Sequence, residues 1–146
     1  MKLKKLTYPV KNISISINSP RDTVYRYASD PSNFPAWLAF VKSIARQSEN
    51  VWNAETSLGQ ILFELVPQND FGVIDQVVTL PDDSKVSNIL RVVENNEGSE
   101  VIFTLFRMPG RSDAEFEEDA QAVREDLEKL KELLEKIERR QPFDNG

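Results

Sequence analysis

Two hydrophobic periods occur along this chain. Residues 12–18 place Ile13, Ile15 and Ile17 at alternate positions, the period of two that is typical of a strand with one solvent-facing side. Further strands are expected at residues 42–48, 51–56, 59–67, 71–80, 85–94 and 99–108. Short connections between the later strands favour antiparallel pairing of neighbours. The pattern therefore predicts an antiparallel sheet of about six to seven strands.

Two short helices are predicted directly after the first strand. Ser19 is expected to cap the first helix, with Pro20 at its first helical position. Asp30 and Pro31 repeat this arrangement, and a second helix is expected through residues 36–41.

A third, long helix is predicted near the end of the chain, where Ser112 and Glu115 have the spacing of a capping box. Its apolar positions form one stripe at spacings of four and three: Phe116, Ala120, Val123, Leu127, Leu130, Leu134 and Ile137. We interpret this stripe as the face that covers the sheet. The alternative is the seam of a coiled-coil dimer.

Composition narrows the classes of function. The 146 residues carry a net charge of -6 and contain no histidine and no cysteine. We expect one domain over residues 1–140, a frayed tail over 141–146 and a cytoplasmic location. No apolar run reaches the roughly 18 residues of a membrane span, so membrane insertion is not expected.

The same composition limits the chemistry that the chain can perform. The lack of histidine excludes a Ser-His-Asp system and the usual zinc sites, so no metal is predicted. No Walker or GxGxxG loop is present, and no cofactor is predicted. The one basic cluster is Lys2, Lys4, Lys5 and Lys11, which we interpret as solvated, so nucleic acid is not an expected partner.

The order of these elements carries a resemblance to a known family. The chain resembles the START-like (SRPBCC) superfamily in the segment "SINSPRDTVYRYASDPSNFPAW". A bacterial polyketide cyclase/dehydrase-like subgroup of that superfamily is resembled by the segment "FGVIDQVVTLPDDSKVSNILRVVENNEGSEVIFTLFRMPG". The resemblance implies an α+β helix-grip fold, in which a curved antiparallel sheet wraps around the long C-terminal helix. It also implies a cavity between them, with the two short helices closing one end.

The direction of the Asp75 side chain depends on strand register. If residues 81–84 form a four-residue loop, Leu80 pairs with Lys85 and Asp75 lies opposite Leu90. This register turns Asp75 and Val77 toward the cavity. The alternative register turns Asp75 toward water.

The loop at residues 95–98 is expected to pair Glu94 with Ser99. Leu90 then lies opposite Phe103. If Asp75 is inward, it is a polar group in an apolar pocket, and Asp75→Asn should change ligand affinity more than stability.

Residues predicted to line the cavity come from the second short helix, the inner face of the sheet and the long helix: Trp37, Phe40, Phe63, Asp75, Val77, Asn88, Leu90, Phe103, Leu105, Val123 and Leu127. Trp37 and Phe40 could form a lid or fill the core, and Phe63 and Phe103 could be ordinary core residues.

The sequence predicts binding of a hydrophobic or aromatic small molecule. The alternatives are a cyclase or aromatase-type enzyme and a protein-interaction module resembling the co-chaperone members of the superfamily. Catalytic residues and oligomeric state are not predicted.

Overall fold

One curved sheet and one long helix dominate the computed structural model, which describes residues 4–140. In chain order, the elements are β1 (Val10–Ile17), α1 (Arg21–Ala28), the 3-10 helix η1 (Pro31–Asn33), α2 (Phe34–Trp37), β2 (Val41–Ser48), β3 (Val51–Thr56), β4 (Gly59–Leu65), β5 (Gln76–Thr79), β6 (Lys85–Asn95), β7 (Gly98–Phe106) and α3 (Asp113–Arg140).

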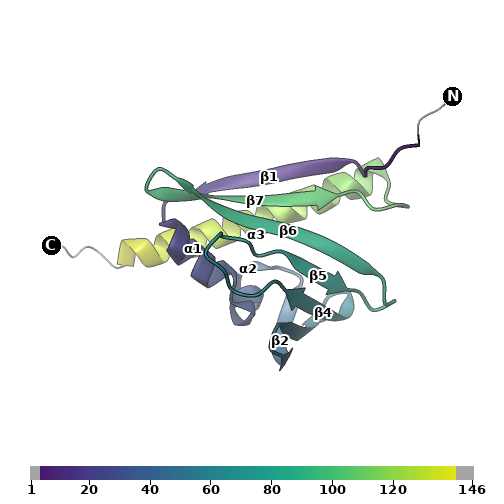
Figure 1. Cartoon of the computed structure of the whole chain (residues 1–146), viewed down its shortest axis with the longest axis horizontal. Helices are drawn as coiled ribbons and strands as arrows, with labels where there is room; N and C mark the ends of the chain where they lie inside the picture. Colours follow the sequence, from purple (N-terminus) through teal and green to yellow (C-terminus); the bar gives the residue numbers. More distant parts are fainter. Residues whose placement is uncertain (1–3, 141–146) are drawn as a thin grey trace.

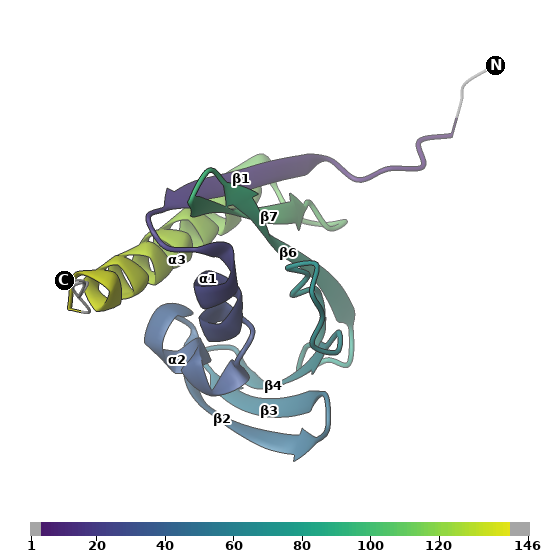
Figure 2. The ribbon, with the colours of Figure 1, turned by 60° about the vertical axis from the view of Figure 1, so that its left-hand side comes forward.

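The sheet has seven antiparallel strands in the order β1-β7-β6-β5-β4-β3-β2. Figure 2 shows it curving from β1 and β7 through β6 to β4, β3 and β2, with α1 and α2 on the concave side. The α+β helix-grip prediction is confirmed. The tail predicted to be frayed, residues 141–146, lies outside the described residues.

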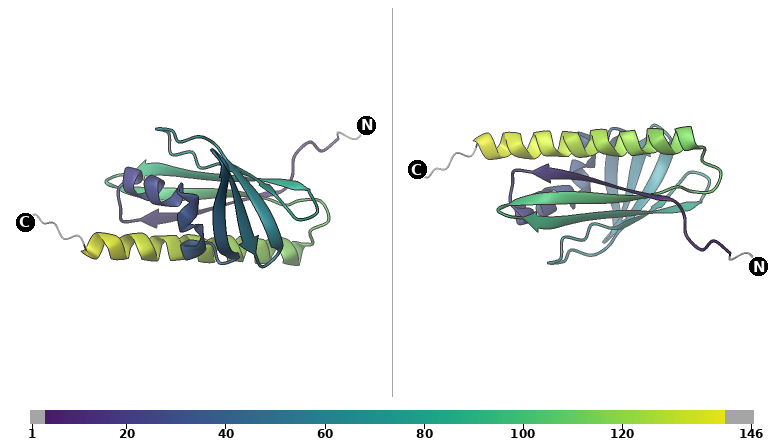
Figure 3. Two further views of the ribbon diagram at one scale, coloured as in Figure 1. Left: turned by 90° about the horizontal axis from the view of Figure 1, so that it is seen from below. Right: turned by 90° about the horizontal axis from the view of Figure 1, so that it is seen from above.

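Helix α3 runs lengthwise along the sheet, as Figure 3 shows, and it contacts β1, β7 and α2. Leu127, Leu130 and Leu134 of its apolar stripe are buried in the same core as Ile13 of β1 and Val101 of β7. The interpretation of the stripe as the face that covers the sheet is therefore confirmed. Within the described residues, no helix has the length and apolar character needed to cross a membrane.

The first short helix begins one position later than the sequence predicted. Pro20, with extended backbone angles, is the N-cap, and no side chain caps α1. Ser19 instead lies buried next to β7, where its carbonyl oxygen accepts a 2.6 Å hydrogen bond from the Ser99 hydroxyl. Tertiary burial of Ser19 thus replaces the predicted capping role.

The second helical segment is shorter than predicted. Asp30 caps η1 as expected, because its carboxylate accepts a 3.0 Å hydrogen bond from the Ser32 backbone N–H. Helix α2 ends at Trp37, and Leu38 already has an extended backbone. The predicted range of 36–41 is wrong because Val41 begins β2.

The register of β6 against β7 agrees with the prediction. Glu94 pairs with Ser99, and Leu90 lies opposite Phe103. Asn96 adopts a positive φ of 55° in the connecting turn. The inner face of these two strands is consequently the one that the sequence predicted.

The register of β5 against β6 differs from the prediction by one residue. Thr79, and not Leu80, pairs with Lys85, and Gln76 lies opposite Asn88. A shift of one residue exchanges the two faces of a strand.

The cause of this shift is a three-residue turn over residues 81–83. Leu80 N donates to Ser84 O at 2.8 Å, so these two residues close the hairpin. Asp83 N donates back to Leu80 O at 2.9 Å, and Asp83 adopts a φ of 70°. A tight turn followed by a left-handed residue is a common way to build a three-residue hairpin loop.

Candidate functional site

A cavity of about 330 Å³ lies between the concave face of the sheet and α3. Most of the side chains around it are apolar. The strands contribute Phe63 of β4, Leu90 of β6, and Phe103 and Leu105 of β7, whereas α3 contributes Ala122, Val123 and Leu127. The cavity therefore occupies the position that the helix-grip arrangement implies.

The segment after η1 closes one side of the cavity with Trp37, Leu38 and Phe40. Aromatic contacts hold this segment on the sheet, since the Phe40 and Phe63 ring centroids are 6.4 Å apart. Trp37 is 3% exposed, and its Nε1 is buried without a hydrogen-bond partner among the described residues. Trp37 thus combines the two roles considered for it, because it both fills core and borders the cavity.

The mouth of the cavity lies between the β3–β4 turn and α3. Leu58 in that turn is 65% exposed, and Ala122 on α3 is also exposed, although both border the cavity. Leu58 was not among the predicted residues, because its turn carries no periodic signal.

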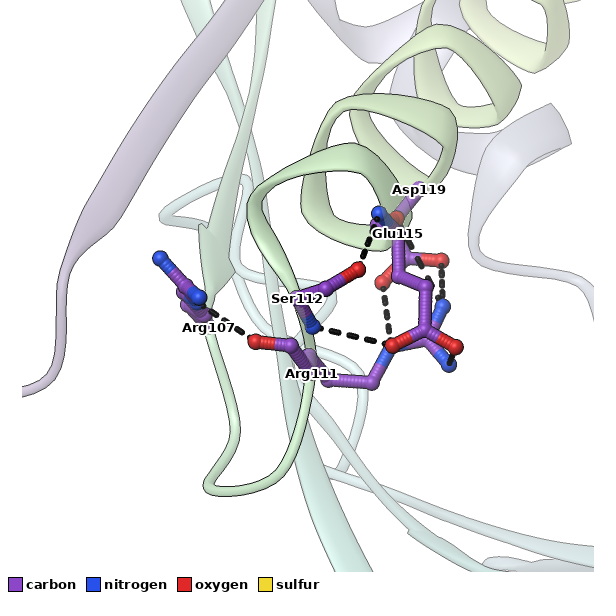
Figure 4. A network of polar contacts seen from close by, with 5 residues as sticks. All are labelled: Arg107, Arg111, Ser112, Glu115 and Asp119. Atoms are coloured by element: carbon purple, nitrogen blue, oxygen red, sulfur yellow. Dashed lines mark hydrogen bonds and ion pairs between the residues drawn. The ribbon is translucent and has the colours of Figure 1, made fainter.

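Asp119 also borders the cavity, and an arginine neutralises it. Arg111 holds the Asp119 carboxylate with Nη2–Oδ1 and Nε–Oδ2 distances of 2.7 and 3.1 Å. Figure 4 shows this pair beside the capping box, in which Ser112 and Glu115 exchange hydrogen bonds as predicted. Arg107 Nε donates to the Arg111 carbonyl oxygen at 2.8 Å and fixes the loop before α3.

Asp126 is the second carboxylate at the cavity. Burial is the main reason why the pKa of Asp126 rises from 3.8 to about 6. A 3.2 Å hydrogen bond from the Ala39 backbone N–H opposes this rise, and the charge of Glu125 adds to it. Within the described residues, no cation forms an ion pair with Asp126. A carboxyl group with such a pKa can gain or lose a proton near neutral pH.

Two amide side chains complete the polar part of the cavity. Gln76 of β5 lies directly opposite Asn88 of β6, and both border the cavity. Gln76 is 6% exposed. Asn88 was predicted at the cavity, whereas Gln76 was missed because the predicted register placed it on the outer face.

Asp75 and Val77 do not border the cavity, and the register shift is the reason. Val77 is 36% exposed on the outer face. The Asp75 carboxylate faces Arg91, with an Arg91 Nη2–Asp75 Oδ2 distance of 2.7 Å, and it also accepts from the Leu90 backbone N–H at 3.1 Å. The predicted inward direction of both side chains is wrong.

The Asp75 carboxylate, in place of a backbone carbonyl, accepts one of the hydrogen bonds between β6 and the segment before β5. Ile74 N donates to Leu90 O at 2.8 Å, whereas Leu90 N donates to Asp75 Oδ1. Gly72, with a φ of 73°, lets the chain approach β6 at this point, because a Cβ there would collide with the Val92 carbonyl oxygen. Asp75 therefore has a structural environment on the outer face.

The other nine predicted residues border the cavity: Trp37, Phe40, Phe63, Asn88, Leu90, Phe103, Leu105, Val123 and Leu127. Whether they bind a ligand stays a prediction. The acidic residues Asp119 and Asp126 were missed, although they are seven residues apart and each precedes a member of the apolar stripe. Such spacing places two acids on one edge of a buried helix face.

Residues 12–135 match the family described as polyketide cyclase/dehydrase and lipid transport. Among curated proteins, no match reaches significance.

Solved structures with the same fold include a START superfamily protein from Mycobacterium smegmatis. It is 10% identical, covers 88% of this chain and 98% of its own, and has a TM-score of 0.70. The protein XoxI from Bacillus cereus is 17% identical, with coverage of 88% and 97% and a TM-score of 0.69. A conserved protein from Geobacillus kaustophilus is 13% identical, with coverage of 88% and 96% and a TM-score of 0.71.

Proposed function

Since the chain belongs to the polyketide cyclase/dehydrase and lipid transport family, we propose that it binds a hydrophobic or aromatic small molecule between its sheet and α3. The observation that carries this proposal is the cavity of about 330 Å³, which has mainly apolar and aromatic walls and a few polar groups. Its volume falls at the lower end of the roughly 300–1,000 Å³ that ligand pockets occupy. A small ring system or a short chain suits this space better than a full diacyl lipid.

The mouth of the cavity allows a test that does not disturb the core. Ala122 is exposed and borders the cavity, whereas its neighbour Gln121 is exposed and does not. Ala122→Trp should obstruct entry, and Gln121→Trp is the matched control. We expect Ala122→Trp to weaken binding of the neutral naphthalene fluorophore prodan by at least about tenfold, equivalent to about 1.4 kcal/mol.

Both variants should keep the melting temperature of the unaltered protein, because neither position is buried. If prodan does not bind, or binds equally to both variants, the cavity is not the binding site. Native mass spectrometry of the protein purified from its own source would then show whether any small molecule is retained.

A cyclase-type enzyme is the second candidate, and Asp126 is the observation that favours it. General acid–base catalysis works best when the pKa of the catalytic group lies near the working pH. The pKa of about 6 at Asp126 meets this condition inside an apolar cavity. Under this hypothesis Asp126→Asn abolishes turnover of a bound substrate while prodan still binds. Retained turnover in Asp126→Asn would remove Asp126 from the chemistry.

The third alternative, a protein-interaction module, has less support. It predicts a space between sheet and helix that is filled with side chains, whereas a cavity with an open mouth lies there.

A further inference from the structure

The amide side chains of Gln76 and Asn88, together called the amide pair, are the two neutral polar side chains that border the cavity. The two residues face each other across β5 and β6, and both border the cavity. Within residues 4–140, neither side chain has a hydrogen-bond partner. An amide offers two N–H donors and one carbonyl acceptor, and burying such a group without partners costs free energy. Because Gln76 is 6% exposed, bulk water gives it little compensation.

The charges around the cavity have one sign. Asp119 and Asp126 are the charged side chains that border it, and among the described residues no lysine or arginine does so. Arg111 neutralises Asp119 with two hydrogen bonds from outside the lining. Asp126 receives one hydrogen bond from the Ala39 backbone N–H and, in the part of the chain that the structure describes, no charge-balancing partner.

This charge pattern opposes an anionic ligand. A carboxylate or phosphate that leaves water loses several kcal/mol of hydration unless a cation or several donors replace the water. Here it would also meet the Asp126 carboxylate. The amide pair, in contrast, can serve a neutral acceptor and a neutral donor together, as a carbonyl, hydroxyl or amide group presents them.

Building on the proposed function, we infer that the ligand is uncharged at its polar end and that Gln76 and Asn88 bind that end. The class is therefore a neutral apolar molecule with a carbonyl, hydroxyl or amide group, and free fatty acids and other carboxylates are excluded from it. Such a ligand supplies hydrogen-bond partners to the buried Gln76 amide and the half-buried Asn88 amide.

An isosteric pair of compounds separates charge from shape. β-Naphthamide and β-naphthoate share one ring system and differ at the polar end, where one is neutral and the other is an anion at pH 8. Calorimetric titration of the full chain should show β-naphthamide binding at least about tenfold more tightly, a difference of about 1.4 kcal/mol. Equal affinity, or tighter binding of β-naphthoate, would overturn the inference while leaving the proposed function intact.

The role of the amide pair is tested with Gln76→Met, which keeps the length of the side chain and removes its polar atoms. The matched control is Gln47→Met, an exposed position on β2 that does not border the cavity. We expect Gln76→Met to weaken β-naphthamide binding at least about threefold and to reduce the preference for β-naphthamide over β-naphthoate. We expect no loss of stability, because an apolar side chain suits this site in the protein without ligand.

Unchanged β-naphthamide affinity in Gln76→Met would refute the assignment of the amide pair. If neither naphthalene compound displaces prodan, the comparison of Gln76→Met with Gln47→Met is made on prodan itself, whose carbonyl is the acceptor. If prodan also fails to bind the unaltered protein, the proposed function fails and not this inference alone.

Discussion

Two carboxylates, one on the outer face of the sheet and one on α3 beside the cavity, show how differently a partly buried acid can be accommodated. Asp75, on the outer face, accepts hydrogen bonds from the Arg91 guanidinium and from the Leu90 backbone N–H. Asp126, on the cavity side, accepts one backbone hydrogen bond and has no cation beside it within the described residues.

The difference separates a structural role from a candidate functional one. Asp75 supplies the acceptor for the Leu90 backbone N–H of β6 at a point that precedes the start of β5. The hydrogen bond from Arg91 to Asp75, together with their opposite charges, raises the pKa of Arg91. Asp126 keeps a carboxyl group in an unfavourable environment, and groups of that kind concentrate at sites of binding or catalysis. Substitutions at each acid, and at the turn of residues 81–83 that sets the face of Asp75, test this difference.

The largest effect is expected for Asp75→Ala. The substitution leaves the Leu90 N–H without its acceptor, and Leu90 is 2% exposed. We expect a loss of about 1–3 kcal/mol in the free energy of unfolding and no change in prodan affinity. Chemical denaturation measures the first quantity and fluorescence titration the second.

This outcome reverses the sequence-based expectation, which assigned Asp75 a role in ligand affinity. Asp70→Ala, at an exposed position in the preceding loop, is the control. Reduced prodan affinity with unchanged stability in Asp75→Ala would restore Asp75 to the cavity.

A smaller effect with a distinct pH dependence is expected for Asp126→Asn. The folded protein holds a proton on Asp126 up to a pKa of about 6, whereas the unfolded chain releases it near 3.8. Stability from this group therefore falls as the pH rises from about 4 to 6, and the penalty is complete above that window. Asparagine removes the penalty and can still accept from the Ala39 N–H.

Relative to the unaltered protein, Asp126→Asn should gain on the order of 1 kcal/mol more at pH 8 than at pH 4, after allowance for solvent screening at this partly exposed group. Unfolding curves at the two pH values measure the difference. Glu128→Gln, which changes an exposed acid on the same helix, should show no such dependence. A pH-independent effect of Asp126→Asn would mean that the group titrates normally.

The smallest effect is expected at the turn of residues 81–83. Asp83 has a left-handed backbone, which glycine adopts without steric cost, so Asp83→Gly should leave stability unchanged or raise it by up to about 1 kcal/mol. Asp82→Gly should lower the melting temperature, because the Asp82 carboxylate accepts hydrogen bonds from Ser84 N and Oγ. A loss in Asp83→Gly as large as that in Asp82→Gly would contradict the three-residue turn and the faces assigned from it.

Local sequence signals predicted the framework of this fold well. The capping box at Ser112 and Glu115 and the stripe from Phe116 onward are patterns within one helix, so they could be identified without knowledge of the tertiary structure. The β6–β7 register was also predicted correctly, since counting across a short turn was sufficient there.

The errors arose where one backbone angle or one distant partner decides the outcome. The φ of 70° at Asp83 shortened a loop by one residue and moved Asp75 and Val77 to the outer face. Asp126 was missed because an acid beside an apolar stripe resembles a solvated helix residue, and its burial depends on the Ala39 segment from elsewhere in the chain. Periodicity in the sequence carries no information about the Asp83 backbone angle, and it places Asp126 beside the apolar stripe without showing what buries it.

Mapping the bound probe with NMR shows whether a ligand binds on the concave face of the sheet. Prodan is added to ¹⁵N-labelled protein, and the side-chain amide signals of Gln76 and Asn88 and the indole signal of Trp37 are followed. We predict that these three signals shift in proportion to occupancy while the Arg91 guanidinium signal on the outer face stays unchanged. Shifts at Arg91 with no change at Gln76, Asn88 and Trp37 would place prodan on the outer face and refute binding between the sheet and α3.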